Sequence, residues 1–487
     1  MQNVQSNKGI FLSLDWMTIG IYVVMVIWGW FSVCGASYDF NNPDVFSFST
    51  NSGKQLVWIG TSMALGCMIL FVEKRFFDTS AFFVYTMMIL LLLVTIFIAP
   101  DTKGSRSWLP LGPVKLQPAE FAKFSVALAL AKLMDRYGFN MRDYHDFLKA
   151  VGLVILPMVL IVCQKETGSA LAYLAFFLVL YREGMTGSLL FTAFASIVYF
   201  VVGVRYSDDF LPKMPVSIGE FSVLMLAQIF TTGMTWVFTR NRMALRLMVY
   251  AGIGTSLLAL LFSIFVIPFD VCQVMLVVCV VMILYLFCLA IYERCYRYAF
   301  IALFGILSTG IYYVTDFAMD HFADHQRVRI EVLLGKKEDA RGAGYNVNQA
   351  KIAIGSGGLI GKGFLNGTQT KLKYVPEQDT DFIFCTVGEE EGFIGASGVL
   401  IAYLIFIWRL ITLAERQPDT LGRVYGYSVC CIFLFHLFIN VGMVLGLTPV
   451  IGIPLPFFSY GGSSLWGFTI MLFIFLRMDA ERNWKRQ

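Results

Sequence analysis

Long apolar runs follow one another along most of this chain. The first covers residues 16–36, and comparable runs recur as far as residue 477. A helix of about 20 apolar residues spans the roughly 30 Å hydrocarbon core of a bilayer. Because the runs are continuously apolar rather than alternating, they favour transmembrane helices over the strands of a membrane barrel. The sequence therefore predicts an all-α, polytopic membrane protein.

About fourteen transmembrane helices are expected. They cover residues 16–36, 55–72, 80–99, 118–134, 148–163, 168–181, 187–204, 218–238, 247–268, 271–291, 297–315, 393–413, 424–447 and 464–477. Short clusters of Lys and Arg lie in alternate loops, for example Lys74 with Arg75 and Arg240 with Arg242. By the positive-inside rule, these loops and both termini face the cytoplasm. The first run is long enough to be kept as a membrane anchor instead of a cleaved signal peptide.

Composition argues against nucleic-acid binding and against a cysteine-based disulfide framework or metal cluster. The 487 residues are 57% hydrophobic and 14% charged, with a net charge of +4. Basic residues are scattered through short loops rather than gathered on one face, so no nucleic-acid partner is expected. Most of the ten cysteines, among them Cys67, Cys272 and Cys279, lie inside apolar runs. They are interpreted as small hydrophobic residues, and neither a disulfide framework nor a metal cluster is expected.

The first candidate site lies at residues 104–123, GSRSWLPLGPVKLQPAEFAK. A polar turn with Arg106 and Trp108 leads into a helix that begins with a proline. Glu120 and Lys123 are three residues apart and so share one face of this helix, near its outer end. Charges at that depth are costly unless they pair or line a hydrated cavity, which indicates a functional site. The alternative is an interfacial ion pair that only sets the depth of the helix.

Two further segments interrupt the apolar pattern. QKETG at Gln164–Gly168 places Lys165 and Glu166 at the same outer face, where they either line the same cavity or form a solvated turn. LTPVIGIPLPFFSYGGSS at Leu447–Ser464 is interpreted as a re-entrant or broken helix. Such backbone persists at membrane depth only where protein buries it or a cavity hydrates it, so it is expected to form a wall of the central site. His436, in the neighbouring apolar span, is interpreted as a packing histidine with its hydrogen bonds satisfied, and the alternative is a ligand.

The most informative stretch is a long polar loop, residues 316–392, predicted to lie outside the cytoplasm. Its glycines permit left-handed backbone and close approach of a ligand. A nucleotide-binding loop is a poor match, because Gly361 and Lys362 are followed by glycine instead of a hydroxyl residue. Asp381 precedes Phe382, Ile383 and Phe384, where partial desolvation would make its carboxylate a better base. The alternative is a cap or turn residue.

Several of these motifs resemble the shape, elongation, division and sporulation family, specifically its RodA branch. The resemblance covers nearly the whole chain. It rests on GSRSWLPLG with QPAEFAK, on GYNVNQAKIAIGSGGLIGKGFLNGTQTKLKYVPEQDTDFIF with GEEEGFIG, and on PLPFFSYGGSS. GTQT at Gly367–Thr370 and GKG at Gly361–Gly363 are more similar to RodA than to its division counterpart FtsW.

The resemblance implies a peptidoglycan glycosyltransferase that polymerises lipid II into glycan strands on the extracytoplasmic side of the membrane during rod-type elongation. It also implies a class B penicillin-binding protein and other membrane proteins of the elongation complex as partners. Asp381 corresponds to the family's essential loop aspartate, and Glu120 and Lys123 correspond to its charged pair in the central cavity. Arg106, Trp108 and Glu377 are further candidate substrate-binding residues.

The implied reaction is a single displacement with inversion at the anomeric carbon. The 4-hydroxyl of lipid II attacks the lipid-linked end of the strand and expels a polyprenyl diphosphate, with Asp381 as general base. Arg106, Lys123 or a bound divalent cation, Mg²⁺ or Mn²⁺, would stabilise the departing negative charge. No other cofactor is expected. Two alternative functions are a lipid II flippase and a scaffold without catalytic activity that recruits the penicillin-binding protein.

The chain departs from the family pattern in two places. QKETG stands where the family usually has QPDLG, which leaves the role of Lys165 and Glu166 open. Residues 187–296 look like an insertion of four helices into a ten-helix core. The predicted domains are therefore residues 1–186, the insertion at 187–296, and residues 297–487 with the catalytic loop.

Overall fold

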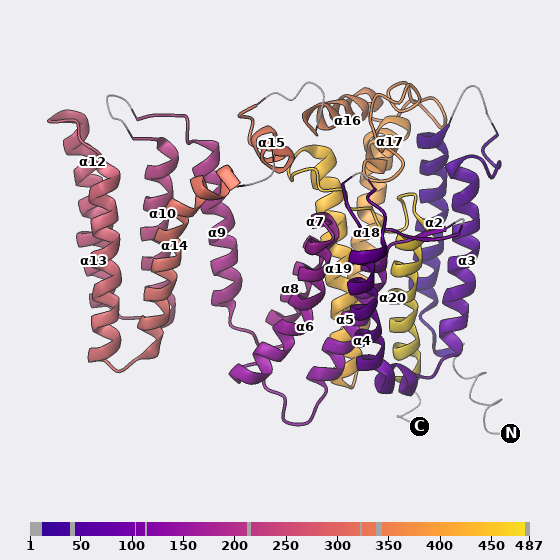
Figure 1. Ribbon diagram of the computed structural model, residues 1–487, viewed down its shortest axis with the longest axis horizontal. Coiled ribbons are helices and arrows are strands. Elements are labelled where there is room, and N and C mark those ends of the chain that lie inside the picture. Colours follow the sequence, from indigo (N-terminus) through magenta and orange to yellow (C-terminus); the bar gives the residue numbers. More distant parts are fainter. Residues whose placement is uncertain are drawn as a thin grey trace. The chain divides into compact units, whose positions relative to one another are not determined.

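The computed structural model describes residues 12–38, 44–102, 104–112, 114–211, 216–321, 324–337 and 343–482. Helices make up almost all of the regular structure in these ranges, with one antiparallel hairpin formed by β1 (Leu109–Leu111) and β2 (Val114–Leu116). The chain divides into two compact units (Figure 1). Met1–Met185 and Tyr345–Gln487 form the core unit, and Thr186–Gly344 form the second unit. The predicted all-α membrane class is confirmed.

All fourteen predicted segments are helical. Among the described residues, twelve helices are long and apolar enough to cross a membrane. The other two segments are shorter: α5, Pro118–Met134, and the apolar run Thr167–Arg182. That run consists of α7 (Thr167–Leu171), η1 (Ala172–Leu174) and α8 (Ala175–Arg182).

The core unit is a helical bundle arranged around α5. Its other helices are α2 (Trp16–Ser37), α3 (Asn51–Phe71), α4 (Lys74–Ile98), α6 (Tyr144–Cys163), α16 (Ala343–Gly357), α17 (Ile383–Glu390), α18 (Gly392–Glu415), α19 (Thr420–Leu445) and α20 (Gly462–Glu481). Asp15, Thr50 and Asp419 cap the N-termini of α2, α3 and α19 by accepting backbone N–H groups. α5 packs against α4, α6, α19 and α20 and is buried along nearly all of its length. Its repeated alanines allow this close approach of neighbouring helices.

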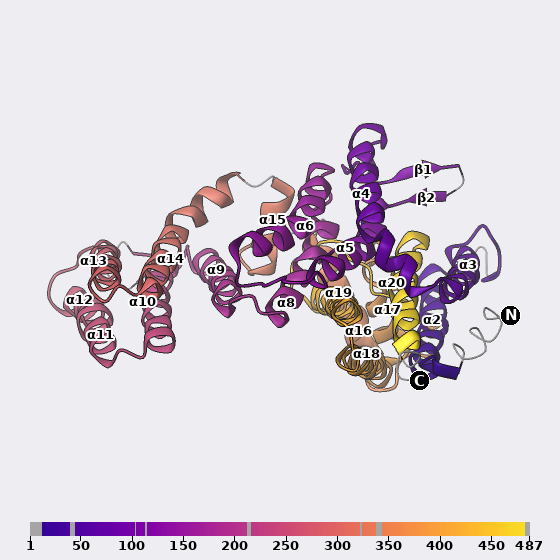
Figure 2. The ribbon, with the colours of Figure 1, turned by 90° about the horizontal axis from the view of Figure 1, so that it is seen from below.

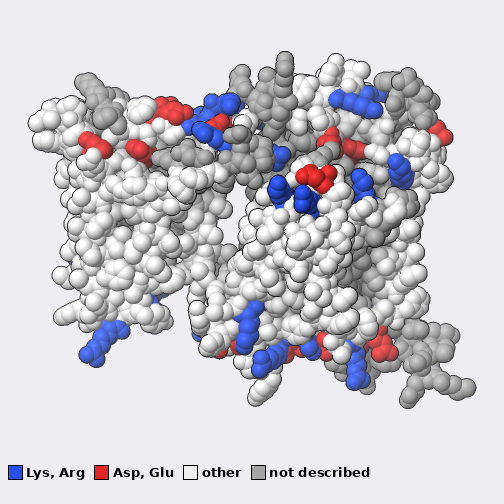
Figure 3. Space-filling model, in the orientation of Figure 1, with Lys and Arg blue, Asp and Glu red and all other residues white. Residues whose placement is uncertain are grey.

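The two ends of the core unit differ. α2 begins and α20 ends at one end, whereas α16 and α17 lie at the other (Figure 1). Seen from below, α20 lies between α3 and α5 and packs against both (Figure 2). On the face of this unit that Figure 3 shows, charged side chains gather toward the two ends and leave an uncharged band between them. Such a band is what a bilayer requires of the lipid-facing surface.

The second unit is built from α9 (Gly187–Arg205), α10 (Ile218–Thr239), α11 (Arg242–Leu247), η2 (Met248–Gly254), α12 (Thr255–Phe265), α13 (Val271–Tyr292), α14 (Tyr296–His321) and α15 (Asp324–Leu333). Helices α11, η2 and α12 form one membrane-length helix with a π-helical middle. Tyr199, Met282 and Phe304 lie in the main apolar cluster of the unit.

The predicted domain limits differ from those of the compact units. The second unit starts within one residue of the predicted insertion, but it extends to Gly344 because α14 packs on α9, α10 and α13. The stretch expected as one loop, residues 316–392, contains the end of α14 together with α15, α16 and α17. The assignment of residues 187–296 as an insertion into a family core stays a prediction.

Candidate active site

A non-helical segment after α19, here called the re-entrant segment (residues 446–461), forms the centre of the candidate site. Gly446 ends α19 with φ 71°, a left-handed conformation that glycine adopts easily. Within the segment, Phe457 and Phe458 are buried, and the Tyr403 hydroxyl donates to the carbonyl of Pro456. Protein thus surrounds this backbone, as expected for a wall of the site.

Asp381 lies against the re-entrant segment. The carbonyl of Glu377 accepts hydrogen bonds from the backbone N–H groups of Thr380, Asp381 and Phe382, at 3.3, 3.1 and 3.2 Å, which closes a tight turn. A Cβ atom added to Gly452 would lie 3.0 Å from Asp381 Oδ2, so the absence of a side chain there makes room for the carboxylate. Asp381 is half-buried, whereas Phe382 is buried. The carboxylate therefore stands at the edge of an apolar interior.

A buried amide holds this arrangement together. Asn440 Nδ2, on α19, donates to the carbonyls of Asp381 and Ile453, at 2.8 Å each. Ser459 Oγ donates to the carbonyl of Thr380 at 2.5 Å. The turn at residues 377–382, here called the aspartate turn, is thus joined to α19 and the re-entrant segment through the carbonyls of Thr380 and Asp381.

Glu120 and Lys123 form the expected ion pair, with 2.7 Å between Lys123 Nζ and Glu120 Oε1. The two side chains are only 3% and 1% exposed, too deeply buried for a pair that merely sets helix depth at an interface. Lys123 Nζ also donates to His436 Nε2 at 3.0 Å, since an ammonium has no acceptor, and His436 Nδ1 then donates to the carbonyl of Pro454 at 3.1 Å. His436 is thus buried with both ring nitrogens hydrogen-bonded, as expected of a satisfied packing histidine.

The QKETG turn also reaches the re-entrant segment. A Cβ atom on Gly168 would lie 2.5 Å from the carbonyl of Ile451. Glu166 Oε2 accepts from Ser107 Oγ at 2.9 Å, and the backbone N–H of Arg106 donates to the carbonyl of Gln164 at 2.9 Å. Glu166 thus pairs with the GSRSW turn, while Lys165 is exposed with φ 62°.

Three of the predicted features contact this one segment. Residues 451–454 contact Asp381 at Gly452, the Lys123–His436 chain at Pro454 and the QKETG turn at Ile451. The Arg106 side chain is exposed and Trp108 is half-buried, so both lie at the outer rim. Within the described residues, Glu120 Oε2 is buried without a hydrogen-bond partner. The arrangement combines a carboxylate at a polar edge with an ammonium deep in the bundle.

Glu389, on α17, is a residue that the sequence interpretation missed. Its side chain is fully buried, and Oε1 accepts from Lys362 Nζ at 2.7 Å and from the backbone N–H groups of Thr368 and Gln369. Oε2 accepts from the N–H of Thr370 at 2.9 Å. Burial alone would raise the pKa of Glu389, but these donors outweigh it and lower that pKa to about 2. The GKG and GTQT motifs are thus folded around one carboxylate.

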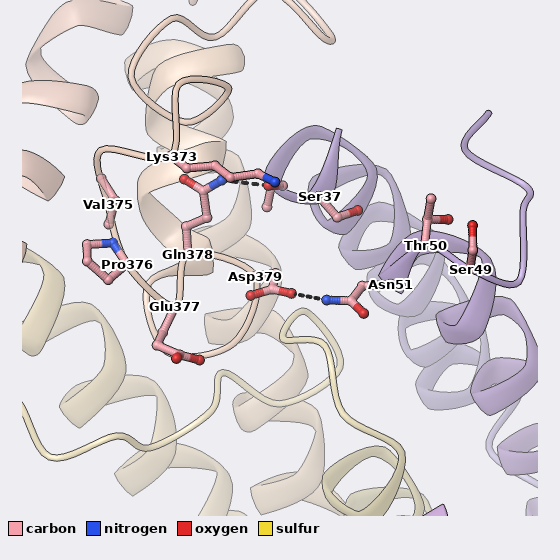
Figure 4. A pocket seen from close by; sticks show the side chains of 11 residues that line it. Ser37, Ser49, Thr50, Asn51, Lys373, Val375, Pro376, Glu377, Gln378 and Asp379 are labelled. Atoms are coloured by element: carbon pink, nitrogen blue, oxygen red, sulfur yellow. Dashed lines mark hydrogen bonds between the residues drawn. The ribbon is translucent and has the colours of Figure 1, made fainter. Parts of the chain in front are cut away.

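A cavity of about 490 Å³ lies beside the aspartate turn. Figure 4 shows its polar lining, which comes from Ser37 at the end of α2, from Ser49, Thr50 and Asn51 at the start of α3, and from Lys373, Glu377, Gln378 and Asp379 of the loop before Asp381. Asn51 Nδ2 donates to Asp379 Oδ2 at 2.6 Å. Glu377, a predicted substrate-binding residue, lines this cavity.

The chain is similar to known proteins over most of its length. The family model of the FtsW, RodA and SpoVE cell cycle proteins matches residues 11–214 and 219–484. Peptidoglycan glycosyltransferase RodA of Treponema pallidum (strain Nichols) is 30% identical over 431 residues, covering 88% of this chain and 89% of that protein. Peptidoglycan glycosyltransferase MrdB of Escherichia coli (strain K12) is 29% identical over 411 residues, covering 83% and 80%.

Solved structures share the fold. A chain from a structure described as "Structural coordination of polymerization and crosslinking by a peptidoglycan synthase complex" superposes with a TM-score of 0.59 at 21% identity, covering 96% of this chain and 98% of that one. The crystal structure of the rod shape determining protein RodA of Thermus thermophilus gives a TM-score of 0.54 at 20% identity, covering 96% and 97%. From the family match and the relatives together, the chain belongs to the FtsW, RodA and SpoVE family of cell cycle proteins.

Proposed function

We propose that this protein is a peptidoglycan glycosyltransferase that polymerises lipid II into glycan strands during rod-type elongation. The activity is the one named for the RodA and MrdB relatives, which align with more than four fifths of the chain. The observation that carries the proposal is the position of Asp381, whose carboxylate lies in the gap left by Gly452 at the edge of the buried re-entrant segment. A carboxylate at such an edge can take a proton from an incoming hydroxyl.

The reaction assigns a role to each charged group. Asp381 accepts the proton of the sugar 4-hydroxyl as its oxygen bonds to the anomeric carbon of the donor. The bond from that carbon to the diphosphate oxygen breaks, and the electron pair leaves with the lipid diphosphate. Lys123, with Arg106 at the rim, supplies positive charge where the diphosphate develops. One displacement inverts the anomeric configuration and needs no second carboxylate as nucleophile.

We propose a divalent cation only as an ion that binds together with the diphosphate of the substrate. Among the described residues, no three His, Cys, Asp or Glu side chains lie close enough to hold a metal ion. Protein ligands in those ranges therefore do not fit a complete Mg²⁺ or Mn²⁺ site. Mg²⁺ is commonly bound through one or two carboxylates plus substrate phosphates, so the diphosphate would supply most ligands.

The proposed orientation places the re-entrant segment and α17 outside the cytoplasmic membrane and both termini in the cytoplasm. Support comes from the basic clusters in the loops on the opposite side. We also propose a class B penicillin-binding protein as the partner. The fold is shared with a chain from a complex described as coordinating polymerization and crosslinking.

Two rival functions predict different outcomes at Asp381. A lipid II flippase needs a polar cavity but no proton acceptor in the aspartate turn, and a scaffold needs neither. The named activity of the relatives favours the enzyme over both.

The decisive experiment measures polymerisation of purified lipid II by the protein with its cognate penicillin-binding partner. The wild type should produce long strands, and Asp381→Asn should slow polymerisation by roughly 10²–10⁴-fold, the usual contribution of general base catalysis. Asp208→Asn in the second unit is the matched control and should polymerise normally. If neither wild type nor control makes polymer while lipid II still crosses vesicle membranes, the flippase takes the place of the enzyme.

A further inference from the structure

The cavity beside the aspartate turn is not needed for proton transfer, yet it shares the backbone that holds Asp381. Glu377, Gln378 and Asp379 line it, and the carbonyl of Glu377 accepts the hydrogen bond from the N–H of Asp381. Its volume of about 490 Å³ falls within the roughly 300–1,000 Å³ of small-molecule binding sites. The cavity therefore adjoins the reaction without containing the base.

The walls of this cavity are held firmly in place. Gln378, only 5% exposed, donates from Nε2 to the carbonyls of Ala36 and Thr370, at 2.6 Å each. Thr370 is itself fixed through its N–H by Glu389. Lys373 and Glu377 have φ angles of 54° and 52°, a left-handed conformation that non-glycine residues keep only where the surrounding structure imposes it. Fixed walls reduce the conformational entropy that the protein loses when a ligand binds.

The chemistry of the lining selects among ligands. Hydroxyl and amide side chains predominate, and the charged groups are one ammonium and two carboxylates. Two carboxylates disfavour a phosphate, and a protein partner would seek aromatic or Arg anchor sites, which this lining does not offer. Neutral donors and acceptors beside a few charges suit the hydroxyl and acetamido groups of sugars. The lining residues Lys373, Glu377 and Gln378 belong to the loop before α17, at the end of the bundle that carries this helix (Figure 1).

We propose that this cavity is a glycan subsite that holds sugars of the growing strand next to Asp381. The inference rests on the proposed function, because it assigns the ligand as the polymer made at that site. The lipid end of the strand stays in the membrane, while sugars already linked extend into the outer polar region. A subsite for them retains the strand between additions, so it governs strand length more than the rate of a single addition.

The test uses full-length protein in nanodiscs with a soluble, lipid-free GlcNAc–MurNAc tetrasaccharide as the probe. Asp381→Asn is the parent, so no turnover takes place. Adding Asn51→Ala or Lys373→Met should raise the tetrasaccharide Kd by roughly tenfold, the effect of about 1.4 kcal/mol of lost hydrogen bonding. Lys149→Ala, which removes an exposed Lys on α6, is the matched control and should leave the Kd unchanged. A Kd within twofold of the parent for both cavity variants overturns the proposal.

Strand length gives an independent readout in protein that retains Asp381. Lys373→Met should shorten the mean glycan strand several-fold, with strand lengths compared at equal total lipid II consumption. Lys373 is exposed, so this variant is expected to fold even if Asn51→Ala does not. Unchanged tetrasaccharide binding with loss of the penicillin-binding protein would make the cavity a protein contact and refute the subsite. Tetrasaccharide binding that depends on the cavity without any polymerisation by wild type would refute the enzyme and leave the subsite standing.

Discussion

The two units bury different kinds of polar side chain. In the described part of the core unit, the buried side chains include Asp15, Glu120, Lys123, Glu389 and Asp479. In the described part of the second unit, every buried polar side chain other than tyrosine and cysteine is a neutral Ser, Thr or Gln, such as Gln228, Thr231 and Ser256. Buried charge inside a membrane protein is expensive and marks function, whereas neutral hydrogen bonds mainly join helices.

From this difference we expect the chemistry in the core unit and mainly helix association in the second unit. Gln228, for example, bonds to Ser256, with 3.0 Å between Ser256 Oγ and Gln228 Oε1, and links α10 to α12. Lys123 instead reaches from α5 to His436 of α19 and through it to the re-entrant segment. Substitutions of buried polar residues should therefore reduce polymerisation when they lie in the core unit and leave it unchanged when they lie in the second unit.

The largest effect is expected at the buried ion pair. Lys123→Met leaves the Glu120 carboxylate buried without its ammonium, which should cost about 3–5 kcal/mol of unfolding free energy and reduce polymerisation at least about a hundredfold. The double variant Glu120→Gln, Lys123→Met should regain most of the stability without the activity. Thermal melting and lipid II polymerisation measure the two effects. Full activity in the double variant would make the pair purely structural.

The second largest effect on polymerisation is expected at Glu389, whose carboxylate lies inside the loop formed by the GKG and GTQT motifs. Glu389→Gln loses the ion pair with Lys362 and weakens the bonds from the N–H groups of Thr368 and Thr370. Polymerisation should fall roughly tenfold, because this loop supports Gln378 and, through it, the turn of Asp381. Hydrogen exchange of residues 361–370 should increase. Glu391→Gln is the control: the Glu391 carboxylate accepts from Trp28 Nε1, so this variant should leave the exchange unchanged.

A smaller, pH-dependent effect is expected at Glu390. Its carboxylate lies against Gly35, and burial first, with repulsion from Glu389 and Glu391, raises the pKa of Glu390 from 4.5 to about 8 despite attraction from Lys371. The folded protein thus holds the proton more tightly than the unfolded chain does. The resulting stability is complete below pH 4.5 and is lost as the pH rises through 8.

Glu390→Gln should therefore remove part of this pH dependence. Between pH 6 and the raised pKa of about 8, wild type should lose about 1.4 kcal/mol of stability per pH unit that the variant keeps, so its melting temperature should fall by several °C more by pH 9. Parallel curves for the two proteins would contradict the raised pKa. Glu73→Gln, at the start of α4, is a suitable control.

The smallest effect is expected in the second unit. Gln228→Leu removes neutral hydrogen bonds between membrane helices, the shortest of them with Ser256, and should cost only about 0.6 kcal/mol for each well-formed bond, with unchanged polymerisation. The measurements are thermal melting and initial polymerisation rate. A tenfold loss of activity would break the comparison, because it would show that the second unit takes part in the reaction.

Much of the fold could be predicted because apolar runs specify membrane helices directly. The ends of these helices were less accurate. α4 begins at Lys74 instead of residue 80, and α14 continues to His321 past residue 315, since a helix extends into polar sequence that an apolar run does not include. The three helices of the 316–392 stretch were missed because glycine and charge mask a helical pattern.

The candidate site could be predicted only where the contacts are local. The Glu120–Lys123 pair spans three residues, and helical spacing alone brings the two side chains together. The Lys123–His436 hydrogen bond joins residues 313 positions apart, so nothing near His436 in sequence indicates it. Asp381 stood out by its apolar neighbours, but the opening left by Gly452 appears only in three dimensions.

The long reach of these contacts bears on how the protein is made. The Asn440 amide joins Asp381 to Ile453, and the Lys123–His436 chain ends at Pro454. The bonds to Ile453 and Pro454 cannot form before the ribosome has delivered the chain as far as these residues. The second unit, whose contacts lie within residues 186–344, can assemble earlier in synthesis. A nascent chain is therefore catalytically silent until almost its last helix enters the membrane.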